Sequence, residues 1–278
     1  MTTKKSHAKV NLILRVLRKR EDGYHDILSL MQRISLCDEM EFSLTDEAIG
    51  IQCPGSALPE GRDNIVYKAV EALFTHASYS QGVNIKIRKM IPVSAGLGGG
   101  SSNAATALVT LNEMIGLKYN PEELMKIGAK IGADVPFFVF SRTAWVSGIG
   151  DHVQKARDIP AMWFVLVNPD FEISTKDIYE ELNLGLTKET IKYSVQRFES
   201  APQIAGCLYN DLENVSLRIY PVLSKVKELL IAHGALGSLM SGSGPTVFGI
   251  FRNEKDATNA ADELRKSNIG SVYTAHSI

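Results

Sequence analysis

Apolar residues occur along this chain in short runs, and their spacing predicts a mixture of strands and helices. Residues 9–17 (KVNLILRVL) are rich in branched apolar side chains and form a run too short for a buried helix, so we expect a strand there. Further strands are predicted over 27–36, 38–44, 83–88, 137–148, 162–167 and 271–276, with a strand, a tight turn and a strand over 238–251. Helices are predicted over 64–76, 101–116, 121–132 and 254–267, and from Thr175 and Pro221 onwards.

The first predicted strand carries polar residues inside its apolar run. Side chains alternate between the two faces of a strand, so Lys9, Asn11 and Ile13 are expected on one face and the apolar residues at 12, 14 and 16 on the other. The second set is expected to be core. A lysine and an asparagine that face together the other way indicate a place for a polar site.

The order of the elements predicts the fold class. Strands and helices are mixed without strict alternation, which favours an α+β fold over a doubly wound parallel sheet. The polar stretch 150–160 (GDHVQKARDIP) is the best linker candidate. We therefore expect two domains, over residues 1–153 and 154–278.

Composition and charge exclude several classes of protein. The 278 residues are 45% hydrophobic with a formal net charge of -1, and no block of like charge indicates a nucleic acid or a membrane as partner. Cys37, Cys53 and Cys207 lack the spacing of a disulfide framework or a zinc site, which is typical of a reducing cytosol. The apolar run near the N-terminus is too short to span a membrane, so a cytoplasmic location is expected.

A glycine-rich run, IPVSAGLGGGSSN (residues 91–103), joins an apolar strand to an apolar helix. A linker is disfavoured because both neighbours are apolar, but a purely structural turn remains an alternative. At a helix N-terminus, glycines let an anion approach unpaired N–H groups, which favours a phosphate-binding loop. The run is neither a Walker A loop, since no Gly-Lys-Ser/Thr follows, nor a Rossmann fingerprint, since Ser101 stands where the third glycine is required.

The sequence AGLGGGSSNAA resembles the phosphate loop of the GHMP kinases, a family that includes galactokinase, homoserine kinase and mevalonate kinase. The resemblance extends over the whole chain, because further family motifs follow in the same order. One departure is Ser94, where members often have glycine, and a single β-carbon there is expected to leave the activity unchanged. The other resembling segments are AKVNLILRV (8–16), REDGYHDILS (20–29), DNIVYKA (63–69), GADVPFF (132–138), SGIGD (147–151), STKDIY (174–179), NDLE (210–213) and MSGSGPTVFG (240–249).

The resemblance implies a two-domain GHMP kinase fold, with an N-terminal ATP-binding domain and a C-terminal ferredoxin-like α/β sandwich domain. It also implies transfer of the γ-phosphoryl group of ATP, with Mg²⁺ through ligands left unassigned, to the 2-hydroxyl of cytidylyl methylerythritol. A monomer or weak homodimer is expected. Two alternatives remain: a GHMP kinase for a smaller alcohol, and a nucleotide-binding regulator that has lost catalysis.

The resemblance assigns catalytic and nucleotide-binding residues. Asp134 matches the catalytic aspartate and would act as general base, although alone it would pass for a capping or turn residue. Lys9 matches the active-site lysine, and Asn11 would hydrogen-bond the substrate hydroxyl or the base. The residues expected at ATP are Asn64 and Lys89, near the adenine, and the phosphate loop, here Pro92, Val93, Ser94, Ala95, Gly96, Leu97, Gly98, Gly99, Gly100, Ser101 and Ser102.

Aromatic residues indicate the acceptor substrate. By resemblance, Tyr24 and His25 contact a cytidine, which the tyrosine can stack against and the histidine can hydrogen-bond. Tyr179 matches a second aromatic wall, with Thr175 nearby. The alternative for Tyr24 and His25 is a turn with an aromatic edge, and the alternative for Tyr179 is packing on a helix surface. The 241–244 turn is expected either to support the site or to be a simple hairpin turn.

Overall fold

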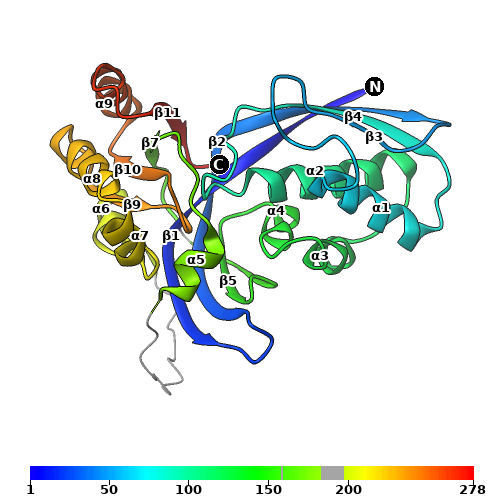
Figure 1. The fold of residues 1–278 in the computed structure, drawn as a ribbon, viewed down its shortest axis with the longest axis horizontal. Coiled ribbons are helices and arrows are strands. Elements are labelled where there is room, and N and C mark those ends of the chain that lie inside the picture. Colours follow the sequence, from blue (N-terminus) through cyan, green and yellow to red (C-terminus); the bar gives the residue numbers. More distant parts are fainter. Residues whose placement is uncertain (158, 183–196) are drawn as a thin grey trace.

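The computed structural model describes residues 1–157, 159–182 and 197–278, and two β-sheets organise them (Figure 1). In this part of the chain the larger sheet has seven strands. Five of them lie in the order β3-β4-β2-β1-β8, and the β5–β6 hairpin adds the other two through the pairing of β5 with β2. All pairs are antiparallel except β3 with β4 and β1 with β8. The strands are β1 (Thr2–Lys19), β2 (His25–Thr45), β3 (Gly50–Gln52), β4 (Gly82–Arg88), β5 (Ala144–Gly148), β6 (His152–Lys155) and β8 (Tyr209–Asn210).

The smaller sheet has the order β11-β7-β10-β9 and is antiparallel throughout. Its strands are β7 (Trp163–Asn168), β9 (Gly237–Met240), β10 (Val247–Phe251) and β11 (Ser271–His276). Helix α8 (Val222–Ala232) precedes β9, and α9 (Glu254–Lys266) connects β10 to β11; both pack against this sheet (Figure 1). If these four strands are numbered 1 to 4 along the chain, their order across the sheet is 4-1-3-2. This is the ferredoxin-like arrangement predicted for the C-terminal part.

Four helices gather beside the larger sheet: α1 (Ile65–Ala77), α2 (Gly99–Ile115), α3 (Pro121–Ala129) and α4 (Val135–Phe140) (Figure 1). They bury one core with the sheet, in which Phe42, Ile85, Leu111 and Phe137 are almost fully enclosed. Helix α2 begins after Gly98, which lies in the left-handed region, and ends at the left-handed cap Gly116. The core therefore holds α2 firmly, with its N-terminus directly after the glycine-rich loop.

Three short helices complete the described chain, α5 (Thr175–Glu180), α6 (Ala201–Gly206) and α7 (Glu213–Ile219). Strand β8, from the C-terminal part, pairs with β1 of the larger sheet. The linker predicted over 150–160 contains strand β6, which pairs with β5. The expected domain division between residues 153 and 154 therefore falls inside β6. That division stays a prediction.

Two strand predictions need correction. The ranges 27–36 and 38–44 form one continuous strand, β2. The strand predicted over 137–148 is wrong in its first part, where VPFFVF forms α4 with Pro136 in the first turn, and β5 begins only at Ala144. A short apolar run does not distinguish a buried helix from a buried strand, whereas proline in the first helical turn favours the helix.

The face prediction for the first strand holds only up to Asn11. Asn11 pairs with Met31 and Ile13 with Leu30, so Leu12 is an extra residue in a β-bulge. The bulge shifts the alternation, so Leu14 lines the same cavity as Lys9 and Asn11. The prediction that the apolar residues at 12, 14 and 16 are core is confirmed, because all three are buried. In the described ranges, no helix combines the length and apolar character needed to cross a bilayer.

Candidate active site

A cleft of about 1340 Å³ collects most of the residues that the sequence singled out. Its walls come from β1, the β1–β2 hairpin, the phosphate loop, the start of α4, α5 and the turn after β9. These segments lie far apart in the sequence, and both sheets contribute to them. The cleft therefore has the dimensions and the mixed lining of a substrate site.

Lys9, Asn11 and Asp134 meet on one wall of this cleft. The Lys9 ammonium donates to Asn11 Oδ1 at 2.6 Å, and its Nζ lies 3.6 Å from Asp134 Oδ2. The Lys9 side chain is 5% exposed, and that of Asp134 is 29% exposed. A buried cation thus lies beside a carboxylate that substrate can reach.

Asp134 lies at the position before α4, where the sequence left open a capping role. Its side chain accepts no capping hydrogen bond from the described backbone. The carboxylate is instead directed to the cleft and to Lys9. The position of the Asp134 carboxylate is therefore compatible with a catalytic role.

Ser29 orients the Asn11 amide, and sequence reasoning missed it. The Ser29 hydroxyl accepts a hydrogen bond from Asn11 Nδ2 at 2.8 Å and donates one to the Ile13 carbonyl at 2.7 Å. Because the amide nitrogen is engaged by Ser29, the amide oxygen faces Lys9. A lone serine in an apolar strand carries no sequence signal for this role.

The phosphate loop needs glycine at two positions for reasons the structure makes explicit. Gly96 and Gly98 have φ of 74° and 68°. A Cβ on Gly96 would lie 2.1 Å from the carbonyl oxygen of Ser241, and one on Gly98 would lie 2.9 Å from the Phe138 ring. Ser94 also has positive φ, at 52°, although it has a side chain. The loop is thus closely packed against the turn after β9 on one side and against α4 on the other.

The same loop separates the large cleft from a second cavity of about 270 Å³. Ser94, Gly96, Gly98 and Ser101 line both spaces. A phosphate held at this wall, against the N-terminus of α2, would be reachable from both sides. The expected ATP residues that line only the second cavity are Lys89, Pro92, Val93, Ala95, Gly99 and Gly100.

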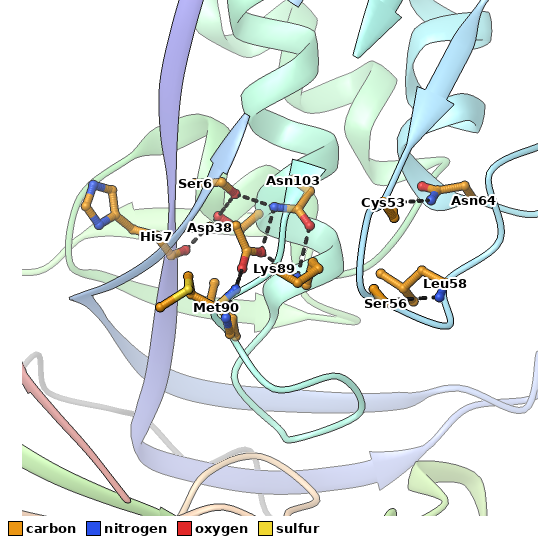
Figure 2. Close-up of polar contacts among 12 residues, drawn as sticks. Ser6, His7, Asp38, Cys53, Ser56, Leu58, Asn64, Lys89, Met90 and Asn103 are labelled. Atoms are coloured by element: carbon orange, nitrogen blue, oxygen red, sulfur yellow. Dashed lines mark hydrogen bonds and ion pairs between the residues drawn. The ribbon is translucent and has the colours of Figure 1, made fainter. Parts of the chain in front are cut away.

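Three expected ATP residues lie outside both cavities. Asn64 caps α1, accepting from Val66 N at 2.8 Å and donating to the Pro59 carbonyl at 2.6 Å, with its amide also near Cys53 (Figure 2). Leu97 is buried. The Ser102 hydroxyl donates to the His7 carbonyl at 2.6 Å and accepts from Ser6. Contact of these three with a nucleotide stays a prediction, and each has a structural role in its own right.

Lys89 faces the second cavity as part of a buried polar cluster, drawn in Figure 2. Its ammonium binds the carboxylate of Asp38 and lies 3.2 Å from Asn103 Oδ1. Asp38 is fully buried, and sequence reasoning missed it. The strands predicted over 27–36 and 38–44 make Asp38 the first residue of the second one, and a lone aspartate at a strand end has no distinctive local pattern.

The aromatic residues expected at the acceptor line the same cleft. The rings of His25 and Tyr179 lie 4.8 Å apart between centroids, tilted by 35°. Tyr24, on the β1–β2 hairpin, is 61% exposed and free to cover a ligand. Thr175 hydrogen-bonds Ser243 at 2.7 Å, so α5 is joined to the turn after β9.

The surroundings of this aromatic pair alter its ionisation. Burial, and then the charge of Lys19, lower the pKa of His25, so the neutral ring that can both donate and accept prevails near neutral pH. Burial, and then the carboxylate of Asp134, raise the pKa of Tyr179, which keeps its phenol protonated. Both side chains therefore present neutral hydrogen-bonding groups to a ligand.

The 241–244 turn supports the phosphate loop, which answers the question that the sequence left open. The Ser241 hydroxyl donates to the Gly96 carbonyl at 2.9 Å. Asn210 holds the turn in place, donating to the carbonyls of Met240 at 2.9 Å and Gly242 at 2.7 Å. The turn is thus a contact between the smaller sheet and the loop as well as a connection between strands.

Comparison with known proteins agrees with this geometry. Residues 64–142 match the GHMP kinases N terminal domain, and residues 193–270 match the GHMP kinases C terminal. A protein of Syntrophus aciditrophicus named 4-diphosphocytidyl-2-C-methyl-D-erythritol kinase is 55% identical over 98% of each chain. One of the same name from Geobacter sulfurreducens is 49% identical over 95% of this chain and 94% of its own.

Solved structures have the same fold. The crystal structure of a 4-(cytidine 5'-diphospho)-2C-methyl-D-erythritol kinase superimposes with a TM-score of 0.80 at 30% identity, covering 99% of each chain. A homoserine kinase from Cytophaga hutchinsonii gives 0.73 at 18% identity, covering 100% of this chain and 95% of its own, and this likeness concerns the fold alone. The resemblance found in the sequence is confirmed, and this chain belongs to the GHMP kinase family.

Proposed function

We propose that this protein transfers the γ-phosphoryl group of ATP to the 2-hydroxyl of 4-diphosphocytidyl-2-C-methyl-D-erythritol, a step of non-mevalonate isoprenoid precursor biosynthesis. The observation that carries the proposal is the phosphate loop as a wall shared by two cavities. One cavity has Lys89 beside the loop; the other has Lys9, Asp134 and the aromatic pair. A phosphoryl group at the wall can pass from a donor on one side to an acceptor on the other.

The residues suggest how the transfer proceeds. Backbone N–H groups at the start of α2 bind the phosphates of ATP, and Lys9 stabilises negative charge on the transferring group. Asp134 accepts the proton of the acceptor hydroxyl while the hydroxyl oxygen forms a bond to the γ-phosphorus. The bond between the γ-phosphorus and the oxygen that bridges it to the β-phosphorus breaks, and ADP is released. Asn11 orients the acceptor hydroxyl.

Mg²⁺ belongs to this proposal as the partner of ATP. The described residues contain no group of three or more His, Cys, Asp or Glu side chains placed to hold a metal ion. Magnesium with ATP requires few protein ligands, because phosphates and waters complete its octahedron. The Ser101 hydroxyl, which lines both cavities, provides oxygen of the kind it prefers, and the bound ion would neutralise phosphate charge.

The cytidylyl acceptor is supported by the names of the close relatives and by the aromatic residues in the cleft. His25, Tyr179 and the exposed Tyr24 provide more aromatic surface than a small alcohol requires. A cytoplasmic monomer or weak homodimer, divided into domains at 153/154, completes the proposal.

Turnover against a panel of alcohols tests the function. ADP release should be measured with ATP, Mg²⁺ and, in turn, cytidylyl methylerythritol, homoserine, mevalonate and galactose. We expect turnover with the first alone. Preference for a smaller alcohol would replace this substrate by that of another GHMP kinase. ATP binding without ADP release from any alcohol would instead favour a regulator that has lost catalysis.

A further inference from the structure

Asp38 is a carboxylate on β2 with no exposed surface, and its oxygens accept four hydrogen bonds (Figure 2). Oδ1 accepts from the backbone N–H groups of Met90 at 2.7 Å and Ile91 at 2.9 Å. Oδ2 accepts from the Lys89 ammonium and from Asn103 Nδ2, the latter at 2.9 Å. Burying a carboxylate is costly unless it is paired and hydrogen-bonded, and this one is fully satisfied.

These four bonds connect three segments that build the nucleotide side of the site. Asp38 lies on β2, the donors at 89–91 form the chain that enters the phosphate loop, and Asn103 lies near the start of α2. Asn103 also donates to Ser6 on β1 at 2.9 Å. Asp38 thereby fixes both ends of the loop, its entrance directly and its helical exit through Asn103.

The contact with Lys89 connects this buried cluster to the second cavity. The Lys89 side chain is 9% exposed and lines the cavity beside Gly99, whose added Cβ would lie 3.2 Å from the ammonium. Without its bonds to Asp38 and Asn103, a lysine side chain has many rotamers from which to choose. Asp38 itself is unsuited to bind Mg²⁺, because donors occupy both of its oxygens.

We propose that Asp38 is a positioning residue for ATP, which acts by holding the Lys89 ammonium and the entrance of the phosphate loop at the wall between the two cavities. The inference rests on the proposed function and extends it to a residue that makes no contact with either cavity.

The substitution Asp38→Asn tests the proposal with little change in volume. It removes the charge and replaces one acceptor by a donor, which faces either Lys89 or a backbone N–H group. We expect the dissociation constant for ATP, measured calorimetrically without acceptor, to rise about tenfold. The KM of the acceptor alcohol should stay within about twofold, because Tyr24, His25 and Tyr179 are unchanged.

A double-mutant cycle with Lys89→Met separates positioning from general loss of structure. If Asp38 acts through Lys89, Asp38→Asn should weaken ATP binding by less than about threefold once Lys89 is methionine. Equal losses in both backgrounds, or unchanged ATP binding in Asp38→Asn alone, would overturn the proposal. Wild-type protein that binds no ATP would reject the proposed function instead, so the two failures are distinguishable.

Two further variants guard against a folding defect. Asn112→Ala removes an amide at the other end of α2 that bonds the N–H and carbonyl of Tyr119, each at 3.0 Å, and it should lower the melting temperature with ATP binding unchanged. If Asp38→Asn does not fold, Asn103→Ala removes a second neighbour of Lys89 and should raise the ATP dissociation constant about threefold. Wild-type affinity in Asn103→Ala would contradict the positioning role.

Discussion

Asp134 and Lys9 illustrate how much one residue can decide. Replacement of Asp134 by Asn keeps its shape but removes the proton acceptor beside the Lys9 ammonium. We expect kcat to fall by about 10²- to 10⁴-fold, the usual contribution of general base catalysis, with ATP affinity largely kept. Steady-state kinetics and calorimetry measure the two quantities. Asp262→Asn, an exposed carboxylate on α9, is the matched control, and near-normal turnover in Asp134→Asn would remove Asp134 from the role of base.

Tyr24 carries the prediction for acceptor binding. Its ring is 61% exposed at the mouth of the cleft, so removing it leaves no cavity in the core. Stacking of a base on an aromatic ring contributes about 1–3 kcal/mol, so Tyr24→Ala should raise the KM of the cytidylyl acceptor at least about fivefold. Tyr24→Phe keeps the ring and should keep the KM. An unchanged KM in the alanine variant would exclude stacking.

Part of the candidate site could be predicted from spacing alone. Lys9 and Asn11 are two apart in a strand and therefore face the same way, and the structure places their side chains 2.6 Å apart. Asp134 and Tyr179 were selected by family resemblance, since a lone aspartate or tyrosine has no distinctive local pattern. Ser29 and Asp38 were missed because their importance lies in partners that only the folded chain brings to them.

At the scale of elements, the start of α2 depends on a glycine that cannot be replaced. Gly98 has φ of 68°, and an added Cβ would meet Phe138 at 2.9 Å and Lys9 Cε at 3.2 Å. Gly98→Ala should therefore weaken ATP binding by at least about tenfold, beyond the roughly 1–2 kcal/mol of left-handed strain. Gly116→Ala, at the other end of the helix, has the same strain with no atom within 4 Å. It should lower stability only, and equal ATP affinity in the two variants would argue that the loop is merely structural.

Long, strongly patterned elements were the ones that the sequence predicted well. Helices α1, α2 and α9 have clear caps and periodicity and lie within two residues of their expected ends. The failures have local causes. The bulge at Leu12 reverses a face assignment, because one inserted residue changes the parity of every later position. The apolar run of α4 shows neither the helical nor the strand periodicity of apolar residues, so only Pro136 in the first turn distinguishes a helix from a strand there.

At the scale of the whole molecule, the site is assembled from both sheets. Strand β8 adds the C-terminal part to β1, and the turn after β9 reaches the phosphate loop. The same turn meets α5 through the bond between Ser243 and Thr175. Donor and acceptor sides therefore share one turn. No local pattern in the sequence reports such a contact, since Ser241 and Gly96 are 145 residues apart.

Ser241 tests whether the smaller sheet contributes to nucleotide binding. Ser241→Ala removes the hydroxyl that donates to the Gly96 carbonyl at 2.9 Å and leaves the backbone of the turn in place. A neutral hydrogen bond contributes about 1 kcal/mol, so we expect the ATP dissociation constant to rise about fivefold. Ser238→Ala, on β9 just before the turn, is the matched control, because its buried hydroxyl has no partner among the described residues. Equal ATP affinity in the two variants would mean that the loop holds its conformation without the smaller sheet. A loss confined to Ser241→Ala would mean that phosphate binding depends on how the two sheets are joined.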